Sequence, residues 1–159
     1  MPTYPLTFSV STTDSDPKAD HWNHEEGDAL LQVAIPEEFG GSGNGYSPED
    51  FLGMALTNCF LATFRVYAKL SKLSYEELEV SVSYDVDYGE KKQLQVTRAH
   101  FNVALRAGNE ERMSRLLKKV STGCIMLNSL KVEKTFDFKV NPLEFEVQIG
   151  QTDKNEPSS

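Results

Sequence analysis

The feature that most constrains this chain is one long apolar segment that follows a strong helix start. Ser47-Pro48-Glu49-Asp50 places a hydroxyl at the N-cap, a proline at the first helical position and two carboxylates in the first turn. Each of these choices favours a helix N-terminus. Apolar residues then recur at spacings of three and four, at Phe51, Met54, Ala55, Cys59, Ala62, Thr63, Val66 and Leu70. The pattern predicts one unbroken helix from about residue 48 to about residue 70.

Charge and composition restrict the partners of such a chain. The predicted helix contains Asn58, Arg65 and Lys69, which suits an amphipathic core helix better than a membrane span. The 159 residues carry a net charge of −8, so nucleic acid and anionic lipid surfaces would repel the protein. We therefore expect no nucleic acid and no membrane as partner. Two cysteines cannot build a disulfide framework and the N-terminus has no secretory pattern, which favours a cytoplasmic protein.

Alternating apolar residues predict strands on both sides of the long helix. The predicted strands are residues 5–10, 29–35, 78–88, 99–107, 132–140 and 143–149, and a second helix runs from the N-cap Asn109 to Gly123. Residues 14–26 are polar and irregular, the connection 89–97 is charged and exposed, and Cys124 opens a short segment of one or two helical turns. We expect an α+β fold, with an antiparallel sheet covered on one face by helices. A single domain over residues 1–150 and a disordered polar tail at 151–159 are predicted.

Two further motifs are weak as ligand sites. The loop Gly40 to Gly45 precedes a helix N-terminus, where phosphates bind, but it has neither of the established glycine-rich phosphate patterns and two carboxylates follow it. We interpret this loop as a flexible connector. His21 and His24 have no third metal ligand at a recognisable spacing, so we expect a solvated loop there, and His100 is read as a sheet residue. We expect no metal and no organic cofactor.

The two cysteines carry more chemistry. Cys124 follows a helix-stopping glycine and begins a short helical segment, where the helix dipole is expected to lower the pKa of the thiol. Cys59 lies inside the long helix, where the dipole helps little, so a thiolate there needs a cation or a hydrogen-bond donor from elsewhere. A buried cysteine can also be an inert small hydrophobe. Spacing alone does not show whether the two side chains meet.

Taken together, the glycine loop, the helix start and the cysteines resemble the OsmC/Ohr family of osmotically inducible and organic hydroperoxide resistance proteins. The matching residues are Pro36, Gly40, Gly41, Gly43, Gly45, Pro48, Glu49, Phe51, Leu52, Ala55, Cys59 and Phe60, followed by Cys124, Asn128 and Leu130. The resemblance extends over about residues 25–140. It implies an intertwined homodimer in which long central helices pack on strongly curved antiparallel sheets, with active sites at the subunit interface.

The resemblance also implies an activity, the thiol-dependent reduction of organic hydroperoxides in the oxidative stress response. It implies an external dithiol reductant, of the lipoyl type, and no cofactor. By position, Cys59 matches the peroxidatic cysteine, Cys124 the resolving cysteine, and Glu49 the carboxylate that orients an activating arginine. No arginine precedes Arg65, and the matching loop position holds Lys18. Lys18 either supplies the cation, without the planar fork of arginine, or is a solvated surface lysine.

The distance between the candidate groups limits how such a site can be built. Ten residues of helix at ~1.5 Å each separate Glu49 from Cys59 by ~15 Å. The carboxylate must therefore act through a cation, a helix break at Gly53, or a partner subunit, and a homodimer meets this requirement. Two other functions stay open at this point. One is a non-enzymatic dimer that binds small hydrophobic or electrophilic molecules or senses oxidants, and the other is a structural dimer with inert cysteines.

Overall fold

The computed structural model of the protein describes residues 2–144. The chain divides into two compact units, residues 1–52 and 53–159, which are described in turn. The single domain predicted for residues 1–150 stays a prediction. The predicted tail at 151–159, and residues 145–149 of the last predicted strand, lie outside the described residues.

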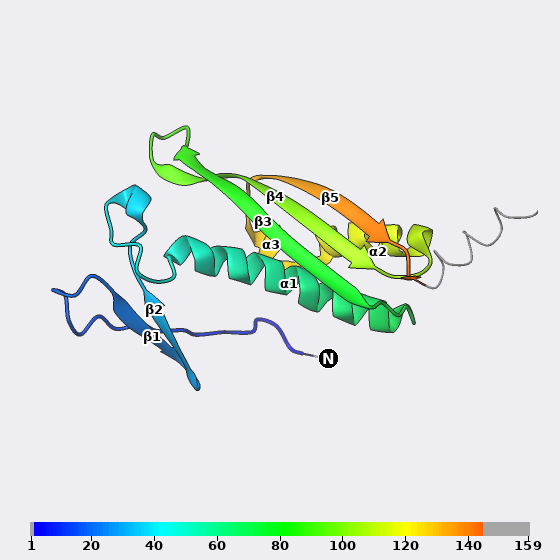
Figure 1. The fold of residues 1–159 in the computed structure, drawn as a ribbon, viewed down its shortest axis with the longest axis horizontal. Coiled ribbons are helices and arrows are strands. Elements are labelled where there is room, and N and C mark those ends of the chain that lie inside the picture. Colours follow the sequence, from blue (N-terminus) through cyan, green and yellow to red (C-terminus); the bar gives the residue numbers. More distant parts are fainter. Residues whose placement is uncertain (1, 145–159) are drawn as a thin grey trace, which may run out of the picture. The chain divides into compact units, whose positions relative to one another are not determined.

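The first unit is built on an antiparallel hairpin of β1 (Trp22–Glu26) and β2 (Ala29–Val33), shown in Figure 1. The prediction that residues 14–26 are irregular is wrong for β1, because pairing with β2 makes this polar segment a strand. The strand predicted at residues 5–10 is also wrong. That segment has no strand structure, and its three apolar side chains, Leu6, Phe8 and Val10, are exposed, so alternation without a pairing strand is insufficient.

Backbone hydrogen bonds stabilise the conformation of the glycine loop. After the 3-10 helix η1 (Glu37–Phe39), Gly40 adopts the left-handed conformation with φ 79°, which glycine adopts without steric cost. The next amides donate inward: Gly41 N–H to Pro36 O and Gly43 N–H to Ile35 O, both at 3.1 Å. These N–H groups are already used within the loop, which supports its interpretation as a connector rather than a phosphate-binding loop.

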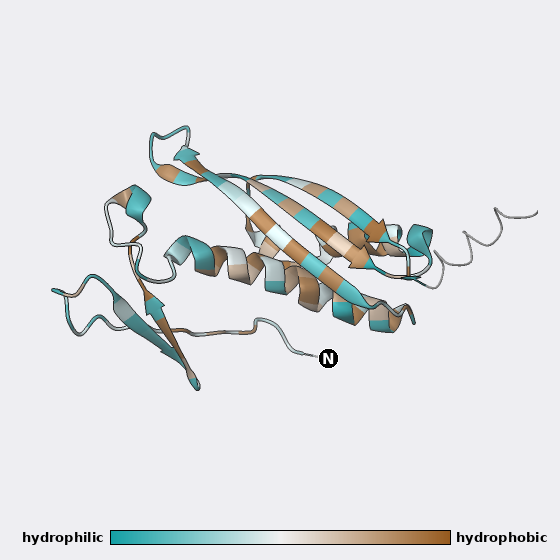
Figure 2. Cartoon of the chain, in the orientation of Figure 1, coloured by the Kyte–Doolittle hydropathy of each residue, from teal (hydrophilic) through white to brown (hydrophobic). Residues whose placement is uncertain are grey.

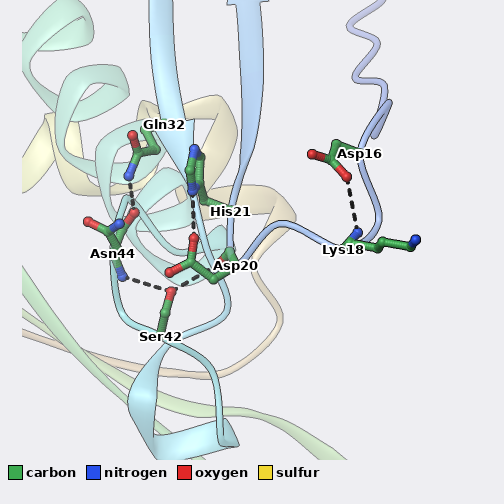
Figure 3. A network of polar contacts seen from close by, with 7 residues as sticks. All are labelled: Asp16, Lys18, Asp20, His21, Gln32, Ser42 and Asn44. Atoms are coloured by element: carbon green, nitrogen blue, oxygen red, sulfur yellow. Dashed lines mark hydrogen bonds and ion pairs between the residues drawn. The ribbon is translucent and has the colours of Figure 1, made fainter.

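Polar side chains connect this loop to its neighbours, as Figure 3 shows. Ser42 Oγ donates to Asp20 O at 3.0 Å and accepts from Asn44 N–H at 3.2 Å. The side-chain amide of Gln32, on β2, donates to Asn44 O. The loop is therefore attached both to β2 and to the segment that leads into β1.

The predicted long helix is confirmed as α1 (Pro48–Leu70), which has 23 residues. Its start is a reciprocal capping box: Asp50 N–H donates to Ser47 Oγ at 3.0 Å, and Ser47 N–H donates to Asp50 Oδ2 at 2.8 Å. Two backbone donors at the helix end are satisfied in this way. Since α1 is continuous, a helix break at Gly53 is excluded.

The face of α1 that enters the core differs from the predicted stripe. The buried residues are Leu56, Phe60, Phe64 and Ala68, a row at spacing four. Several members of the predicted stripe are exposed instead, among them Met54, Val66 and Leu70. The helix is apolar on two sides, and periodicity does not show which of them packs against the sheet. The predicted stripe therefore lies largely on the side that does not.

The second unit contains a three-stranded sheet in the order β3-β4-β5, formed by β3 (Glu77–Tyr88), β4 (Leu94–Arg106) and β5 (Glu133–Asn141). β3 and β4 are antiparallel, whereas β5 is parallel to β4. The sheet is thus mixed rather than antiparallel throughout, because the helices between β4 and β5 return the chain to the starting edge. β4 also begins within the segment 89–97 that was predicted as a connection.

Helices cover one face of this sheet. Along β4 the side chains of Ala99, Phe101, Val103 and Leu105 are fully or almost fully buried. The residues that alternate with them are polar except for Ala104, and Figure 2 shows this alternation along the strands. The Phe60 ring of α1 lies 6.4 Å from the Phe138 ring of β5 between centroids. The predicted α+β class, with helices on one sheet face, is confirmed.

The second and third helices lie where the sequence predicts them. α2 (Glu110–Gly123) begins at the N-cap Asn109, whose Oδ1 accepts from Arg112 N–H at 3.2 Å. It buries Met113, Leu116, Leu117 and Val120. The short helix α3 (Ile125–Ser129) follows at once, with Cys124 as its N-cap.

By length and composition alone, α1 is apolar enough to cross a membrane, and 22% of its most apolar window is buried. The core helix of a soluble protein meets the same criterion. Phe60 and Phe64 are fully buried, and the Phe64 ring meets Tyr75 edge-on at 5.0 Å between centroids. This packing favours a core helix, as the charges of the segment also do.

Candidate functional site

The structure brings Cys59 and Cys124 together. Cys59 lies in the middle of α1 and is half-buried, whereas Cys124 lies between α2 and α3 and is fully buried. The two side chains lie close enough that Cys59 contributes to raising the pKa of the Cys124 thiol. Both are free thiols. Two residues 65 positions apart in the sequence therefore form one dithiol pair, which spacing alone did not establish.

The ionisation of Cys124 differs from the sequence-based prediction. Burial raises the pKa of the Cys124 thiol, and the hydrogen bond with Cys59 raises it further, while backbone hydrogen bonds at Leu127 and Met126 oppose the shift. The expectation that the helix dipole lowers this pKa is therefore wrong. α3 has only five residues, and burial of the sulfur outweighs its dipole because a thiolate without water is strongly disfavoured.

Backbone hydrogen bonds fix the position of Cys124 from both sides. Its N–H donates to Val120 O at 3.1 Å, and its carbonyl accepts from Asn128 N–H at 3.0 Å. The Asn128 side-chain amide also donates back to Thr122 O at 3.1 Å. The last turn of α2 and the first turn of α3 thus form one hydrogen-bonded corner around the cysteine.

Glu49 lies in the first turn of α1 and is half-buried. Its neighbour Asp50 makes the capping hydrogen bonds described above, so the Glu49 carboxylate is not needed to cap the helix. Because α1 is unbroken, Glu49 and Cys59 of one chain stand ~15 Å apart along its axis. A functional link between them has to go through another group.

Lys18 is exposed in the segment before β1. Its backbone N–H donates to Asp16 Oδ1 at 3.3 Å. Figure 3 shows its side chain pointing away from the polar network of Asp20, His21 and Ser42. The described contacts do not bring Lys18 to Glu49, and a role as activating cation stays a prediction.

The histidines have ordinary structural surroundings. The ring of His21 is 2.7 Å from Asp20 Oδ1, a hydrogen bond that lowers the pKa of that carboxyl. His24 lies on β1 rather than in the predicted loop, with its ring 6.1 Å from that of Phe51. His100 is on β4 as predicted, between Thr135 and Asp137 of β5. Within residues 2–144, no three His, Cys, Asp or Glu side chains are placed to hold a metal ion.

Tyr67 is the residue that the sequence analysis misses. It lies on α1 with its ring against Gly123, the residue before Cys124. The signal was available, because Cys59, Thr63 and Tyr67 follow one another at spacing four and so share one side of the helix. The predicted apolar stripe includes Cys59 and Thr63 but not Tyr67, because a phenol is less apolar than the other members of the stripe.

The first unit also contains an apolar hollow. Its volume is about 420 Å³, and it is lined by Val10, Ser11, Thr12, Trp22, His24, Val33, Pro48 and Phe51. Trp22 is the single tryptophan of the chain. Such a hollow suits the apolar part of a small organic molecule.

Several solved structures share this fold at low sequence identity. An organic hydroperoxide resistance protein OsmC from Legionella pneumophila is 18% identical, with a TM-score of 0.68 over 86% of this chain and 99% of that chain. An organic hydroperoxide resistance protein from Elizabethkingia anophelis is 16% identical, with a TM-score of 0.70 over 88% and 100%.

A third structure, a putative organic hydroperoxide resistance protein from Vibrio cholerae, has captopril bound in one of its active sites. It is 20% identical, with a TM-score of 0.64 over 87% of this chain and 95% of that chain. No curated protein sequence matches this chain. At these identities the structures establish the fold and leave the activity open.

A comparison of this sequence with models of protein families shows which family it belongs to. The family model described as "OsmC-like protein" matches residues 41–139, a range that contains both cysteines, the whole of α1 and almost all of the mixed sheet. The family resemblance of the sequence is confirmed by this match and by the shared fold. The chain therefore belongs to the OsmC-like protein family.

Proposed function

We propose that this protein is a two-cysteine peroxidase that reduces organic hydroperoxides. The observation that carries the proposal is the pairing of Cys59 and Cys124, two free thiols that lie close enough for Cys59 to raise the pKa of Cys124. A pair of neighbouring free thiols suits a catalytic cycle of sulfenic acid and disulfide. Family membership and the names of the structural neighbours support the same chemistry.

In the first step, the thiolate of Cys59 attacks the distal oxygen of the hydroperoxide. The sulfur–oxygen bond forms as the oxygen–oxygen bond breaks, so Cys59 is oxidised to a sulfenic acid and the peroxide leaves as an alcohol after taking up one proton. Cys59 is assigned this step because its side chain is half-buried, whereas that of Cys124 is inaccessible to solvent.

In the second step, Cys124 attacks the Cys59 sulfur. The disulfide forms, and the hydroxyl group of the sulfenic acid leaves as water together with the proton that Cys124 gives up. The raised pKa of Cys124 favours its protonated form, which is unreactive toward oxidants, so the peroxide reacts with Cys59 first. An external dithiol then reduces the disulfide by two thiol exchanges, which return both cysteines to the starting state.

The proposal extends to the assembly and to the other assigned groups. We propose that the protein acts as a cytoplasmic homodimer and that Glu49 orients an activating cation across the subunit interface. The exposed apolar residues of α1 and the separation of Glu49 from Cys59 support this arrangement. Lys18 remains the proposed cation from the sequence match alone.

Single cysteine variants test the assignment of roles. Cys59→Ser is expected to abolish the consumption of cumene hydroperoxide, because no sulfenic acid can form. Cys124→Ser is expected to allow one rapid turnover and then to accumulate sulfinic acid at Cys59, because the sulfenic acid has no thiol partner. Mass spectrometry after one equivalent of peroxide distinguishes the two products. Full activity in the Cys59 variant would overturn the proposal.

The substrate class is tested with the unmodified protein. Steady-state assays compare cumene hydroperoxide with hydrogen peroxide, and a dihydrolipoyl compound with a monothiol. We expect the organic peroxide and the dithiol to be preferred. Equal rates with all four combinations would contradict the assignment to organic hydroperoxides.

A second candidate function is a non-enzymatic dimer that binds small hydrophobic molecules. Two observations favour it. The first is that no arginine precedes Arg65 to activate the thiol, and that Lys18, the candidate replacement, is exposed. The second is the apolar hollow of the first unit. Because Trp22 lines this hollow, its fluorescence reports on binding. Saturable quenching by an unreactive alcohol such as cumyl alcohol, in a protein that consumes no peroxide, would establish this second function in place of the first.

A further inference from the structure

Tyr67 and Gly123 make an unusually close contact between α1 and the end of α2. A Cβ atom built on Gly123 would overlap the Tyr67 hydroxyl oxygen and would lie 3.0 Å from Cζ and 3.1 Å from Cε2. Real Cβ atoms show almost no contacts of this kind. Gly123 is the last residue of α2, and it is not among the glycines with positive φ. The close approach of the Tyr67 side chain, rather than the backbone conformation, therefore favours glycine at this position.

The ring of Tyr67 is seated along the last turn of α2. The Lys119 ammonium nitrogen lies 5.1 Å from the centre of the ring, and Lys119 and Gly123 are one helical turn apart. The tyrosine therefore occupies the notch that the glycine leaves, with the lysine chain beside it. Cation–π attraction at this distance holds the ring in the notch.

This contact lies beside the dithiol pair on both helices. On α2, Gly123 is bonded directly to Cys124. On α1, Cys59 and Tyr67 are eight residues apart and share one side of the helix, and helical side chains lean toward the N-terminus, so the Tyr67 ring extends toward Cys59. The chain segment that carries Cys124 thus approaches α1 at two points, which lie ~12 Å apart along the helix axis.

A shift at Gly123 cannot be absorbed before it reaches Cys124. The cysteine amide is bonded to Val120 O and its carbonyl to Asn128 N–H, and the Asn128 side chain is bonded to Thr122 O. The corner between α2 and α3 therefore moves as one piece. The distance between this corner and Tyr67 of α1 therefore also determines the distance between Cys124 and Cys59.

We propose that Tyr67 is a positioning residue for Cys124, and that the fit of its ring into the Gly123 notch sets the approach at which Cys124 meets Cys59. This inference rests on the proposed dithiol chemistry for its biological meaning. The geometric claim concerns disulfide formation alone. It can therefore be tested with an oxidant that requires no peroxidase activity.

The test measures the rate at which diamide closes the Cys59–Cys124 disulfide, followed by acid quenching and mass spectrometry. Diamide first adds to one thiol through a sulfur–nitrogen bond. The second thiol then attacks this sulfur, the sulfur–nitrogen bond breaks, and diamide leaves as the hydrazine with two electrons and two protons while the disulfide forms. Gly123→Ala is expected to slow this closure about tenfold or more, because a misplacement of about 1 Å can cost about 100-fold in rate. Closure at the parent rate would overturn the proposal.

Two further variants separate positioning from general damage. Gly53→Ala is the matched control, since Gly53 also lies in a helix but an added Cβ there would have ordinary contacts, 3.7 Å to Val82 and 3.8 Å to Tyr84. It should close at the parent rate. In the double variant Gly123→Ala with Tyr67→Phe, removal of the hydroxyl leaves contacts of 3.0 and 3.1 Å, and we expect partial recovery of the rate. A double variant as slow as Gly123→Ala would contradict the proposal.

If Gly123→Ala does not fold, Tyr67 variants decide the question. Tyr67→Phe should close at close to the parent rate because the ring still fills the notch, whereas Tyr67→Ala should close several-fold more slowly. Equal rates for these two variants would overturn the proposal. Peroxide consumption by the parent is measured separately, so a parent without peroxidase activity but with rapid diamide closure would refute the proposed function and leave the positioning role standing.

Discussion

At the scale of single residues, the two cysteines differ in burial, and this difference predicts a pH dependence. The pKa of Cys124 is raised by burial and by its hydrogen bond with Cys59, and only the thiolate attacks a sulfenic acid. Below that pKa the fraction of Cys124 thiolate grows with pH. We therefore expect the disulfide-forming step to accelerate from about pH 6 to about pH 9 without reaching a plateau.

Rapid-quench mass spectrometry after a single peroxide pulse measures this step. The oxidation of Cys59 is followed separately in the Cys124→Ser variant. The pH dependence of that first step can then be separated from the pH dependence of disulfide formation. A disulfide-forming rate that levels off near neutral pH would show that Cys124 ionises at a much lower pH than its buried position implies.

At the scale of elements, the two adjacent carboxylates in the first turn of α1 have different expected roles, one in helix capping and one in the proposed site. Asp50 closes the capping box with Ser47, whereas Glu49 is not needed for the cap. Asp50→Ala is expected to lower the free energy of unfolding by about 1 kcal/mol, the usual value of an N-terminal cap. Glu49→Gln is expected to change stability by less than about 0.5 kcal/mol and to lower peroxidase activity.

Urea unfolding at one fixed protein concentration measures both variants, since association would otherwise alter the apparent stability. The steady-state peroxide assay supplies the second readout. A Glu49→Gln variant with parent activity would remove Glu49 from the proposed site, and an equal loss of stability in both variants would show that the cap is shared.

At the scale of the whole molecule, α1 has more apolar surface than its own chain covers. Met54, Val66 and Leu70 are 37%, 55% and 76% exposed, and apolar residues recur along the whole helix in Figure 2. Exposed apolar surface of this kind marks an interaction site, and a second copy of the chain is the proposed partner. Sedimentation at micromolar concentration should therefore give about twice the chain mass of 17.8 kDa.

Val66→Glu is expected to shift this equilibrium toward the monomer, because it places a charge on the apolar side of α1. Asn102→Glu adds the same charge on the exposed polar face of the sheet and serves as the control. A parent protein that sediments as a monomer, or an Asn102 variant that dissociates as readily as the Val66 variant, would rule out this dimer surface.

Much of this protein could be predicted from local sequence. The capping residues Ser47 and Asp50, the unbroken apolar segment after them and the Asn109 cap predict α1 and α2 correctly, because helix signals act within a few residues of one another. The strand β3 and the larger part of β4 follow from simple alternation. The same short-range pattern, with both cysteines, also predicts the family, which the match over residues 41–139 confirms.

Tertiary structure alone decided the rest. β1 became a strand by pairing with β2, and β5 became parallel to β4 because α2 and α3 carry the chain back across the sheet. The contact of Cys59 with Cys124, and the burial that raises the pKa of Cys124, depend on residues far apart in the chain. So does the notch at Gly123. Which strand pairs with which, and which side of an apolar helix is covered, depend on long-range packing that no short window of sequence contains.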